Sequence, residues 1–305
     1  MEDFHKKVIL IHKTMQVGSA QVISLSKKKF PTLLTEITDP PKQLYYRGAL
    51  PEWDRYKFLC VVGSRKYSSY GKEVCEQLIA GLSGYPVVIV SGLALGTDSI
   101  AHKAALSAGL KTIAVPGSGL DDQVLYPASH APLAKQIIER GGALISEFEP
   151  DFRATPYSFP KRNRIMAGMS HAVLVIEAER KSGTMITSRL ATEYNRDVLT
   201  VPGSIFSATS SGPHMLIRLG ATPITSSADL IEALGLSRSA GANTARDYSD
   251  CSPEEKQILV LLNEPMTRDE LIRRSTLSTS EANTILSVLE IKGLTKETLG
   301  EIRLT

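Results

Sequence analysis

The stretch Val87-Val-Ile-Val-Ser-Gly-Leu-Ala-Leu-Gly-Thr-Asp98 sets the pattern for most of the chain. Its first four residues are apolar and β-branched, which is typical of a strand buried on both faces of a sheet. A glycine-rich turn follows and leads into Asp98–Ala108, a segment with helical spacing. A buried strand, a glycine turn and a helix make up the repeating unit of a parallel α/β sheet.

The same unit recurs on both sides of this stretch. Similar apolar runs predict further strands at Phe58–Val62, Lys111–Val115, Ala143–Ser146, Ala172–Ile176, Val198–Val201 and Ala221–Ile224. Between these strands, the spacing of apolar residues predicts helices, for example at Gly71–Leu82 and Ala131–Glu139. We therefore expect an α/β fold with a Rossmann-like, doubly wound, mostly parallel sheet that carries helices on both faces.

Composition changes suggest where the domains begin and end. Residues 1–30, which contain Lys27, Lys28 and Lys29, are expected to form a short N-terminal extension with room for one helix. Residues 31–236 hold the strand–helix repeats and form the predicted Rossmann-like domain. Residues 237–250 are small and polar, as in a linker.

A small C-terminal domain is expected over residues 251–305. Ser252-Pro253-Glu254-Glu255 has the capping serine, first-turn proline and acids of a helix start. Helical stretches follow at about 253–263, 267–275 and 279–292, and two short strands at Leu294–Lys296 and Glu301–Leu304. Three helices and a hairpin are typical of a winged-helix domain.

Bulk composition limits the class of protein. The 305 residues carry a net charge of +3, so a nucleic-acid surface would have to be a local patch. The cysteines, Cys60, Cys75 and Cys251, are odd in number and widely spaced, which indicates a reducing compartment and neither a disulfide framework nor a metal cluster. With no signal-peptide pattern and no membrane-length apolar run, we expect a cytoplasmic protein without membrane contact.

Glycine- and serine-rich turns follow the predicted strands, at the edge of the sheet where ligands bind. They are Gly63-Ser64-Arg65, Ser91 to Asp98, Pro116 to Gly119, Glu177 to Thr184 and Pro202 to Ser204. Free backbone N–H groups in such turns suit phosphates, although some of these glycines could simply make tight turns. There is no Walker A sequence and no complete dinucleotide fingerprint, so no cofactor is expected.

The segment Arg153-Ala-Thr-Pro-Tyr-Ser-Phe-Pro-Lys-Arg-Asn-Arg164 combines four cations and two aromatic residues with no acid. Cations neutralise phosphates and an aromatic face stacks an unpaired base, so the segment predicts single-strand binding. The alternative is a solvated basic loop with one buried aromatic ring. Arg164 in particular could point inward and pair with an acid such as Glu177.

Few residues suggest catalysis. Asp98 and His102 are spaced to share one helix face, where a structural hydrogen bond is favoured over a catalytic dyad. The remaining histidines form no zinc pattern, and there is no nucleophile elbow. We therefore expect neither a metal site nor an enzyme.

Taken together, these loops resemble the DNA-processing protein A family. The matching motifs run in order through residues 31–235: Asp39-Pro40-Pro41, Leu44 to Gly48, Val62 to Arg65, Ser91 to Asp98 with Ala101-His102, Tyr126-Pro127, Ser146-Glu147, Phe159 to Gly168, Ser182 to Thr184 and Val201 to Gly203. The resemblance implies a homodimer that binds incoming single-stranded DNA during natural transformation, protects it and helps load the RecA recombinase.

The resemblance also implies DNA contacts on the Gly-Ser-Arg loop and the basic segment, at Arg65, Phe159, Lys161, Arg162 and Arg164. With neighbouring residues and the loop around Gly183 added, the candidate DNA-binding residues are Ser64, Arg65, Phe159, Lys161, Arg162, Asn163, Arg164, Lys181, Ser182, Gly183 and Thr184. The chain departs from the family pattern at Thr97, Asn195 and His214, where isoleucine, glycine and asparagine are usual. These departures affect loop geometry more than the basic segment.

A rival hypothesis comes from related Rossmann-like enzymes, the phosphoribohydrolases, and from non-catalytic nucleotide sensors. Those enzymes place a catalytic glutamate after a Gly-Thr loop, and the corresponding residue here is Thr187. A threonine cannot act as a carboxylate base. Release of free base from nucleoside monophosphates would separate the enzyme from a DNA-binding protein.

Overall fold

The computed structural model describes residues 21–237, 250–262, 264–298 and 300–304. The chain divides into two compact units, with the boundary between Arg238 and Ser239. Residues 1–20 of the predicted N-terminal extension (1–30) and residues 238–249 of the predicted linker (237–250) lie outside the described residues. No helix in the described part of the chain is long and apolar enough to cross a membrane.

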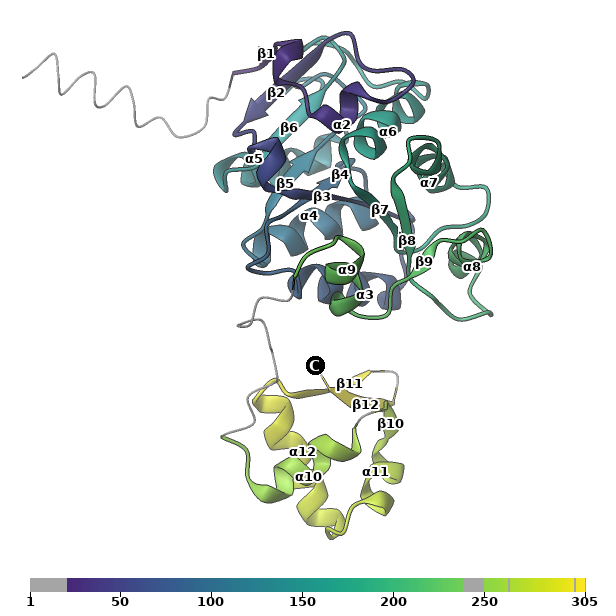
Figure 1. Cartoon of the computed structure of the whole chain (residues 1–305). Helices are drawn as coiled ribbons and strands as arrows, with labels where there is room; N and C mark the ends of the chain where they lie inside the picture. Colours follow the sequence, from purple (N-terminus) through teal and green to yellow (C-terminus); the bar gives the residue numbers. More distant parts are fainter. Residues whose placement is uncertain (1–20, 238–249, 263, 299, 305) are drawn as a thin grey trace, which may run out of the picture. The chain divides into compact units, whose positions relative to one another are not determined.

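The first unit is built on a nine-stranded sheet with the order β1-β2-β6-β5-β4-β3-β7-β8-β9 (Figure 1). Its strands are β1 (Ile23–Leu25), β2 (Leu44–Gly48), β3 (Lys57–Val62), β4 (Val87–Ser91), β5 (Lys111–Ala114), β6 (Ala143–Ser146), β7 (Ala172–Val175), β8 (Asp197–Thr200) and β9 (Thr222–Pro223). Strands β3 to β9 are parallel, whereas β1 and β2 pair in antiparallel register. The expected mostly parallel, Rossmann-like sheet is confirmed.

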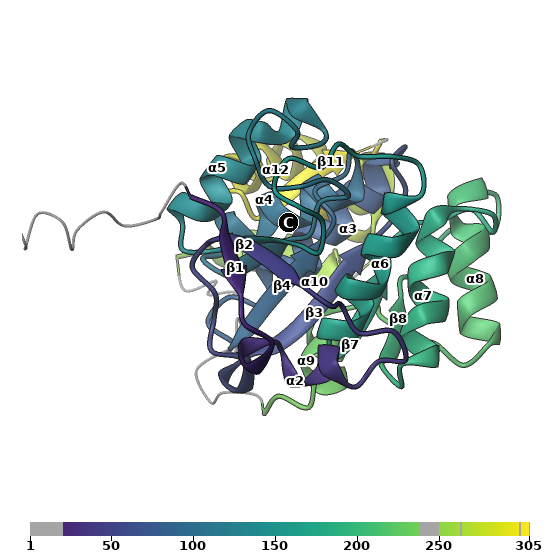
Figure 2. The same ribbon diagram turned by 90° about the horizontal axis from the view of Figure 1, so that it is seen from above.

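Helices cover both faces of this sheet (Figure 2). They are α2 (Thr32–Thr35), α3 (Ser69–Ala80), α4 (Thr97–Ser107), α5 (Ala131–Glu139), α6 (Ser158–Met169), α7 (Gly183–Glu193), α8 (Ser211–Arg218) and α9 (Ser227–Ala233), with 3-10 turns η1 (Lys27–Lys29), η2 (Trp53–Arg55), η3 (Ala128–His130) and η4 (Ala208–Ser210). Alternate residues of β3 enter opposite cores: Phe58 packs on the α6 side and Leu59 on the α3 side. Such alternation explains why the strand is apolar throughout.

The structure contains elements that the sequence analysis did not predict. Residues 21–30 were assigned to an extension, but β1 pairs with β2 as the edge of the main sheet. β2, which follows Pro40 and Pro41, was not predicted, and its register aligns Tyr45 with Ser146 of β6. Helix α6 was not predicted either, and Pro160 lies in its first turn. A proline in the first turn of a helix removes no intrahelical hydrogen bond.

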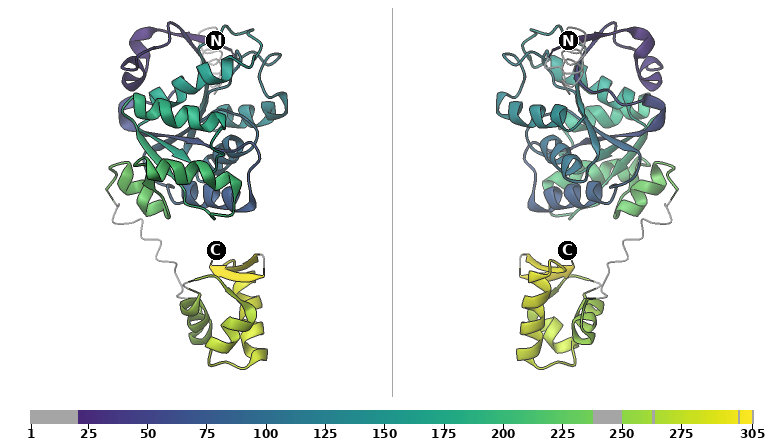
Figure 3. Two further views of the ribbon diagram at one scale, coloured as in Figure 1. Left: turned by 90° about the vertical axis from the view of Figure 1, so that its right-hand side faces the viewer. Right: turned by 90° about the vertical axis from the view of Figure 1, so that its left-hand side faces the viewer.

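The second unit has the winged-helix architecture (Figure 3, green to yellow). Its elements are α10 (Pro253–Leu261), β10 (Met266–Thr267), α11 (Arg268–Arg274), α12 (Thr279–Ile291), β11 (Thr295–Thr298) and β12 (Glu301–Leu304). Ser252 caps α10 as expected, because its hydroxyl accepts from the Glu255 amide and the Glu255 carboxylate accepts from the Ser252 amide. The short β10, which pairs with β12, was not foreseen.

Candidate nucleic-acid interface

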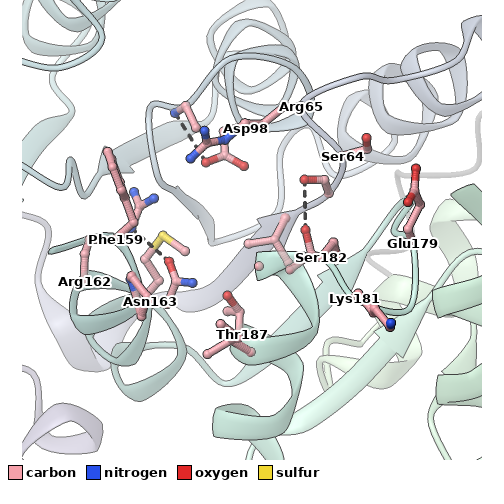
Figure 4. A pocket seen from close by; sticks show the side chains of 18 of the residues that line it. Ser64, Arg65, Asp98, Phe159, Arg162, Asn163, Glu179, Lys181, Ser182 and Thr187 are labelled. Atoms are coloured by element: carbon pink, nitrogen blue, oxygen red, sulfur yellow. Dashed lines mark hydrogen bonds between the residues drawn. The ribbon is translucent and has the colours of Figure 1, made fainter. Parts of the chain in front are cut away.

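A cleft of about 760 Å³ opens at the carboxyl ends of β3, β4 and β7. Its walls come from the loops after β3 and β7 and from the first turns of α6 and α7. Figure 4 shows Phe159, Arg162 and Asn163 on one side and Glu179 and Lys181 on the other. The cleft lies where a doubly wound sheet binds its ligands.

Every predicted site residue except Lys161 and Arg164 lines this cleft. The sequence analysis did not single out two further charged residues in the lining, Lys66 and Glu179. Both are exposed, as are Arg65 and Lys181. Their positions beside Ser64-Arg65 and Lys181-Ser182 could have been read from the sequence, because neighbouring loop residues enter the same cleft.

Arg162 lies in the cleft wall but is 95% buried, with only 5% of its surface exposed. Its Nη1 donates to the carbonyl oxygen of Gly92 at 2.5 Å and to that of Val115, at the ends of β4 and β5. A Cβ on Gly92 would lie 2.0 Å from this nitrogen. The close packing of the arginine therefore explains why position 92 is a glycine. Through these hydrogen bonds Arg162 holds α6 against the sheet.

Asp98 faces Arg162 from the start of α4. Its carboxylate accepts from the backbone amides of Gly92 at 3.1 Å and Ala94 at 3.4 Å. Burial raises the pKa of the Asp98 carboxyl, and the Arg162 charge and the two amides oppose that rise. The Arg162 charge and the backbone amides therefore offset part of the cost of burying the Asp98 carboxylate.

The expected hydrogen bond between Asp98 and His102 is absent from the described bonds of both residues. His102 Nδ1 lies 2.7 Å from Thr112 Oγ1 on β5, inside the core. Burial lowers the pKa of His102 to about 3, so this imidazole is neutral at physiological pH. Within the described residues there is also no group of histidine, cysteine and acidic side chains that could hold a metal ion.

Arg164 is buried and pairs with an acid, as the alternative interpretation of the basic segment proposed, but the acid is Glu147 and not Glu177. Its guanidinium bonds to Glu147 and donates to the Asp39 carbonyl oxygen at 2.6 Å. Lys161 Nζ lies 3.7 Å from the same Glu147 carboxylate. Both cations on α6 therefore face Glu147, which directly follows β6, and they lie outside the cleft lining.

Glu177 instead holds two loops together at the end of β7. Its carboxylate accepts from the Ser68 amide at 2.9 Å, from the Ser68 hydroxyl at 2.7 Å and from the Thr209 hydroxyl at 2.8 Å. Gly71 must lack a side chain, because a Cβ there would lie 2.2 Å from Glu177 Oε2. The buried glutamate thus fixes the segment that follows Arg65 and Lys66.

Phe159 is partly exposed, and its ring lies between polar and aromatic neighbours. The Arg65 guanidinium carbon is 5.4 Å from the ring centroid, and the Tyr126 ring lies 5.6 Å away. A Cβ on Gly117 would lie 2.6 Å from Phe159 Cδ1. The ring therefore packs against the turn after β5 and still contributes surface to the cleft.

Thr97, a departure from the family pattern, supports the Gly-Ser-Arg loop. Its hydroxyl donates to the Ser64 carbonyl oxygen at 3.1 Å. Asn195, a second departure, has a φ of 56°, a conformation that asparagine tolerates better than most residues. At the third departure, His214 Nε2 lies 2.9 Å from the Gly203 carbonyl oxygen.

The start of α7 forms the opposite wall. Gly183 has no heavy atom within 4 Å of the position its Cβ would occupy, so neither packing nor backbone strain explains this glycine. Thr184 donates to the Gly63 carbonyl oxygen at 3.0 Å and thereby joins the two walls. An open helix N-terminus beside the exposed Lys181 is electrostatically suited to an anion.

Comparison with known proteins agrees with this architecture. The family model described as DNA recombination-mediator protein A matches residues 21–235, and the DprA winged helix domain matches residues 242–298. Protein Smf of Escherichia coli is 42% identical over 213 residues, which cover 70% of this chain and 56% of that protein. The DNA processing protein DprA of Streptococcus pneumoniae is 45% identical over 235 residues, 73% of this chain and 80% of that protein.

Two solved structures share the fold. DNA processing protein A of S. pneumoniae superposes with a TM-score of 0.65 at 40% identity, covering 73% of this chain and 77% of that one. The Helicobacter pylori protein, whose structure concerns its single-stranded DNA binding mode, gives 0.63 at 32% identity, covering 70% and 95%. On the family match and these identities, the chain belongs to the DNA recombination-mediator protein A family.

Proposed function

We propose that the cleft binds single-stranded DNA. The observation that carries the proposal is the convergence of exposed cations, Arg65, Lys66 and Lys181, with the partly exposed Phe159 ring around one open cleft. The cations neutralise phosphates, and the open start of α7 at Gly183 accepts another. An aromatic ring adds affinity only for an unpaired base, so this combination favours a single strand over a duplex.

We also propose a biological setting for this binding, supported by the family to which the chain belongs. In this proposal the protein is a cytoplasmic homodimer that binds DNA taken up during natural transformation, protects it from nucleases and helps load the RecA recombinase. The H. pylori relative, with its single-stranded DNA binding mode, supports the first of these steps.

The proposed role is binding without catalysis. Thr187 lies in the cleft lining where the phosphoribohydrolase pattern has its glutamate. Asp98 is committed to two backbone amides and faces Arg162, so it is poorly placed to act as a general base. Incubation with nucleoside monophosphates should yield no free base.

A titration tests the binding role directly. Intact protein is titrated with single-stranded and double-stranded oligonucleotides of one sequence over a series of salt concentrations. We expect tighter binding of the single strand and a linear fall of log affinity with log salt. Equal affinity for the two forms, or binding that is independent of salt, would contradict the proposal.

A further inference from the structure

A second groove, of about 590 Å³, lies between η1 and the segment after β2. Lys28 and Lys29 border it on one side, and Tyr46 and Trp53 contribute aromatic surface. Asp54 is the one acid in its lining. The proposed function makes no use of this groove.

The rim of the groove is fixed by the fold. Trp53 Nε1 donates to the Lys29 carbonyl oxygen at 2.9 Å, which ties η1 to the opposite wall. The indole in turn packs on Phe58 of the central strand, with 5.5 Å between ring centroids. Phe30, directly after the lysines, is buried in the same core. The lysine side chains therefore project from an anchored turn.

Among the described residues, no acidic side chain pairs with the lysines of this rim. Lys27, Lys28 and Lys29 are all exposed, and none of them has an ion-pair partner there. By contrast, Lys135 lies 3.7 Å from Glu139. Three adjacent cations repel one another, and a polyanion would relieve that repulsion. Aromatic surface beside such cations favours a strand with unpaired bases over an acidic peptide.

The groove is separate from the cleft. It borders β1 and β2, at the end of the sheet shown in purple in Figure 1. The two sites lie at opposite edges of the sheet, because Gly48 pairs with Ala143 at the start of β6 and Trp53 packs on Phe58 near the start of β3, whereas the cleft opens at the carboxyl ends of the strands. Phe58 and Val62 are about 13 Å apart along β3 at roughly 3.3 Å per residue, and a strand that reaches both sites has to pass around the outside of the sheet and its helices. A short oligonucleotide bound in the cleft would not reach the groove, whereas a long one could occupy both.

From these observations we infer that the groove is a second contact for single-stranded nucleic acid, and that it acts only on strands longer than the cleft alone accommodates. The inference rests on the proposed function of the cleft. It assigns Lys27, Lys28 and Lys29 to phosphate contacts and Trp53 to contact with a base.

The experiment uses intact protein and the fluorescence of Trp53, the one tryptophan in the sequence. Wild type is compared with the triple variant Lys27→Gln, Lys28→Gln, Lys29→Gln. The matched control, Lys72→Gln, Lys103→Gln, Lys135→Gln, makes the same change in net charge away from both sites. Each protein is titrated with an oligothymidylate of about 6 nucleotides and with one several times longer, because site sizes for such proteins begin at about 4 nucleotides.

We expect the long strand to quench Trp53 in the wild type and in the control. The groove variant should lose that quenching and bind the long strand about tenfold more weakly. Its salt slope, the steepness with which log affinity falls with log salt concentration, should be lower by about 2, or about 0.7 for each lost phosphate contact. Its affinity for the short strand should match that of the wild type.

Three results would overturn the inference: unchanged long-strand affinity in the groove variant, an equal loss in the control, or quenching by polyglutamate and not by oligothymidylate. If wild type binds neither oligonucleotide, the proposed function fails as well. If the wild type binds both oligonucleotides but Trp53 fluorescence does not change, the inference about the groove is wrong and the proposed function of the cleft still stands.

Discussion

The loop after β3 and the helix α6 both place an arginine in the same cleft, and the two arginines differ in almost every physical respect. Arg65 is exposed at a loop tip, and its guanidinium lies over the Phe159 ring. Arg162 is buried, faces Asp98, and donates to the strand-end carbonyl oxygens of Gly92 and Val115. A cation contributes to polyanion binding only if the fold leaves its charge uncompensated. In this cleft the loop cations meet that condition, and the α6 arginine does not.

The largest effect is expected for Arg162→Ala. The substitution leaves Asp98 buried without its counter-charge, and losses of this kind cost about 3–5 kcal/mol. The free energy of unfolding, measured by denaturant titration, should fall by that amount. The salt slope for single-strand binding should not change in the fraction that remains folded.

A double variant provides the control. Arg162→Met with Asp98→Asn removes both charges, and it should recover much of the stability because an uncompensated carboxylate no longer remains. If Arg162→Ala is as stable as the wild type and lowers the salt slope, Arg162 contacts phosphate and the comparison between the two arginines is wrong.

Phe159→Ala should have a smaller, mixed effect. Loss of base stacking should weaken single-strand binding by about 1–3 kcal/mol with little change in salt slope, since stacking releases no counterions. The ring also packs on Gly117, so some loss of thermal stability is expected. Paired melting and binding curves separate the two. A lowered melting temperature with unchanged affinity would mean that the ring serves packing alone.

Arg65→Ala isolates the loop cation. Its exposed side chain contributes little to stability, so the melting temperature should stay within experimental error. Loss of one phosphate contact should lower the salt slope by about 0.7. Arg140→Ala, at another exposed arginine that lies outside both the cleft lining and the basic segment, is the matched control and should leave the slope unchanged. An unchanged slope in both variants would remove Arg65 from the interface.

The contrast between the two arginines also marks the limit of sequence interpretation. Apolar runs such as Val87–Val90 predicted the parallel strands because each such strand is buried on both faces. The same pattern does not tell which side of a basic helix turns inward. Arg162 and Arg164 became internal through partners distant in sequence, Val115 and Asp39, which only the folded sheet brings near. Short edge strands such as β1 likewise owe their structure to pairing more than to pattern.

The two units of the chain also differ in whether their cations are compensated, as the two arginines do. Residues 252–305 carry seven lysines and arginines against nine acids, a net charge of −2. Several of these cations are already compensated: Arg268 bonds to Glu297 at 2.8 Å, and Lys292 bonds to Glu255 at 2.8 Å. The would-be recognition helix α12 carries Glu281 and Glu290 and no cation.

A helix of this charge gains little from phosphate neutralisation, which supplies most non-specific affinity. We therefore predict that the winged-helix unit contacts protein more than DNA. Truncation after Leu236 should leave single-strand affinity within about threefold, or about 0.7 kcal/mol. Circular dichroism serves as the control, because the sheet unit has its own core and should keep its fold. A loss of tenfold or more in a folded truncated protein would place DNA contacts on the winged helix, and compensated charge would then be a poor guide to where this chain binds DNA.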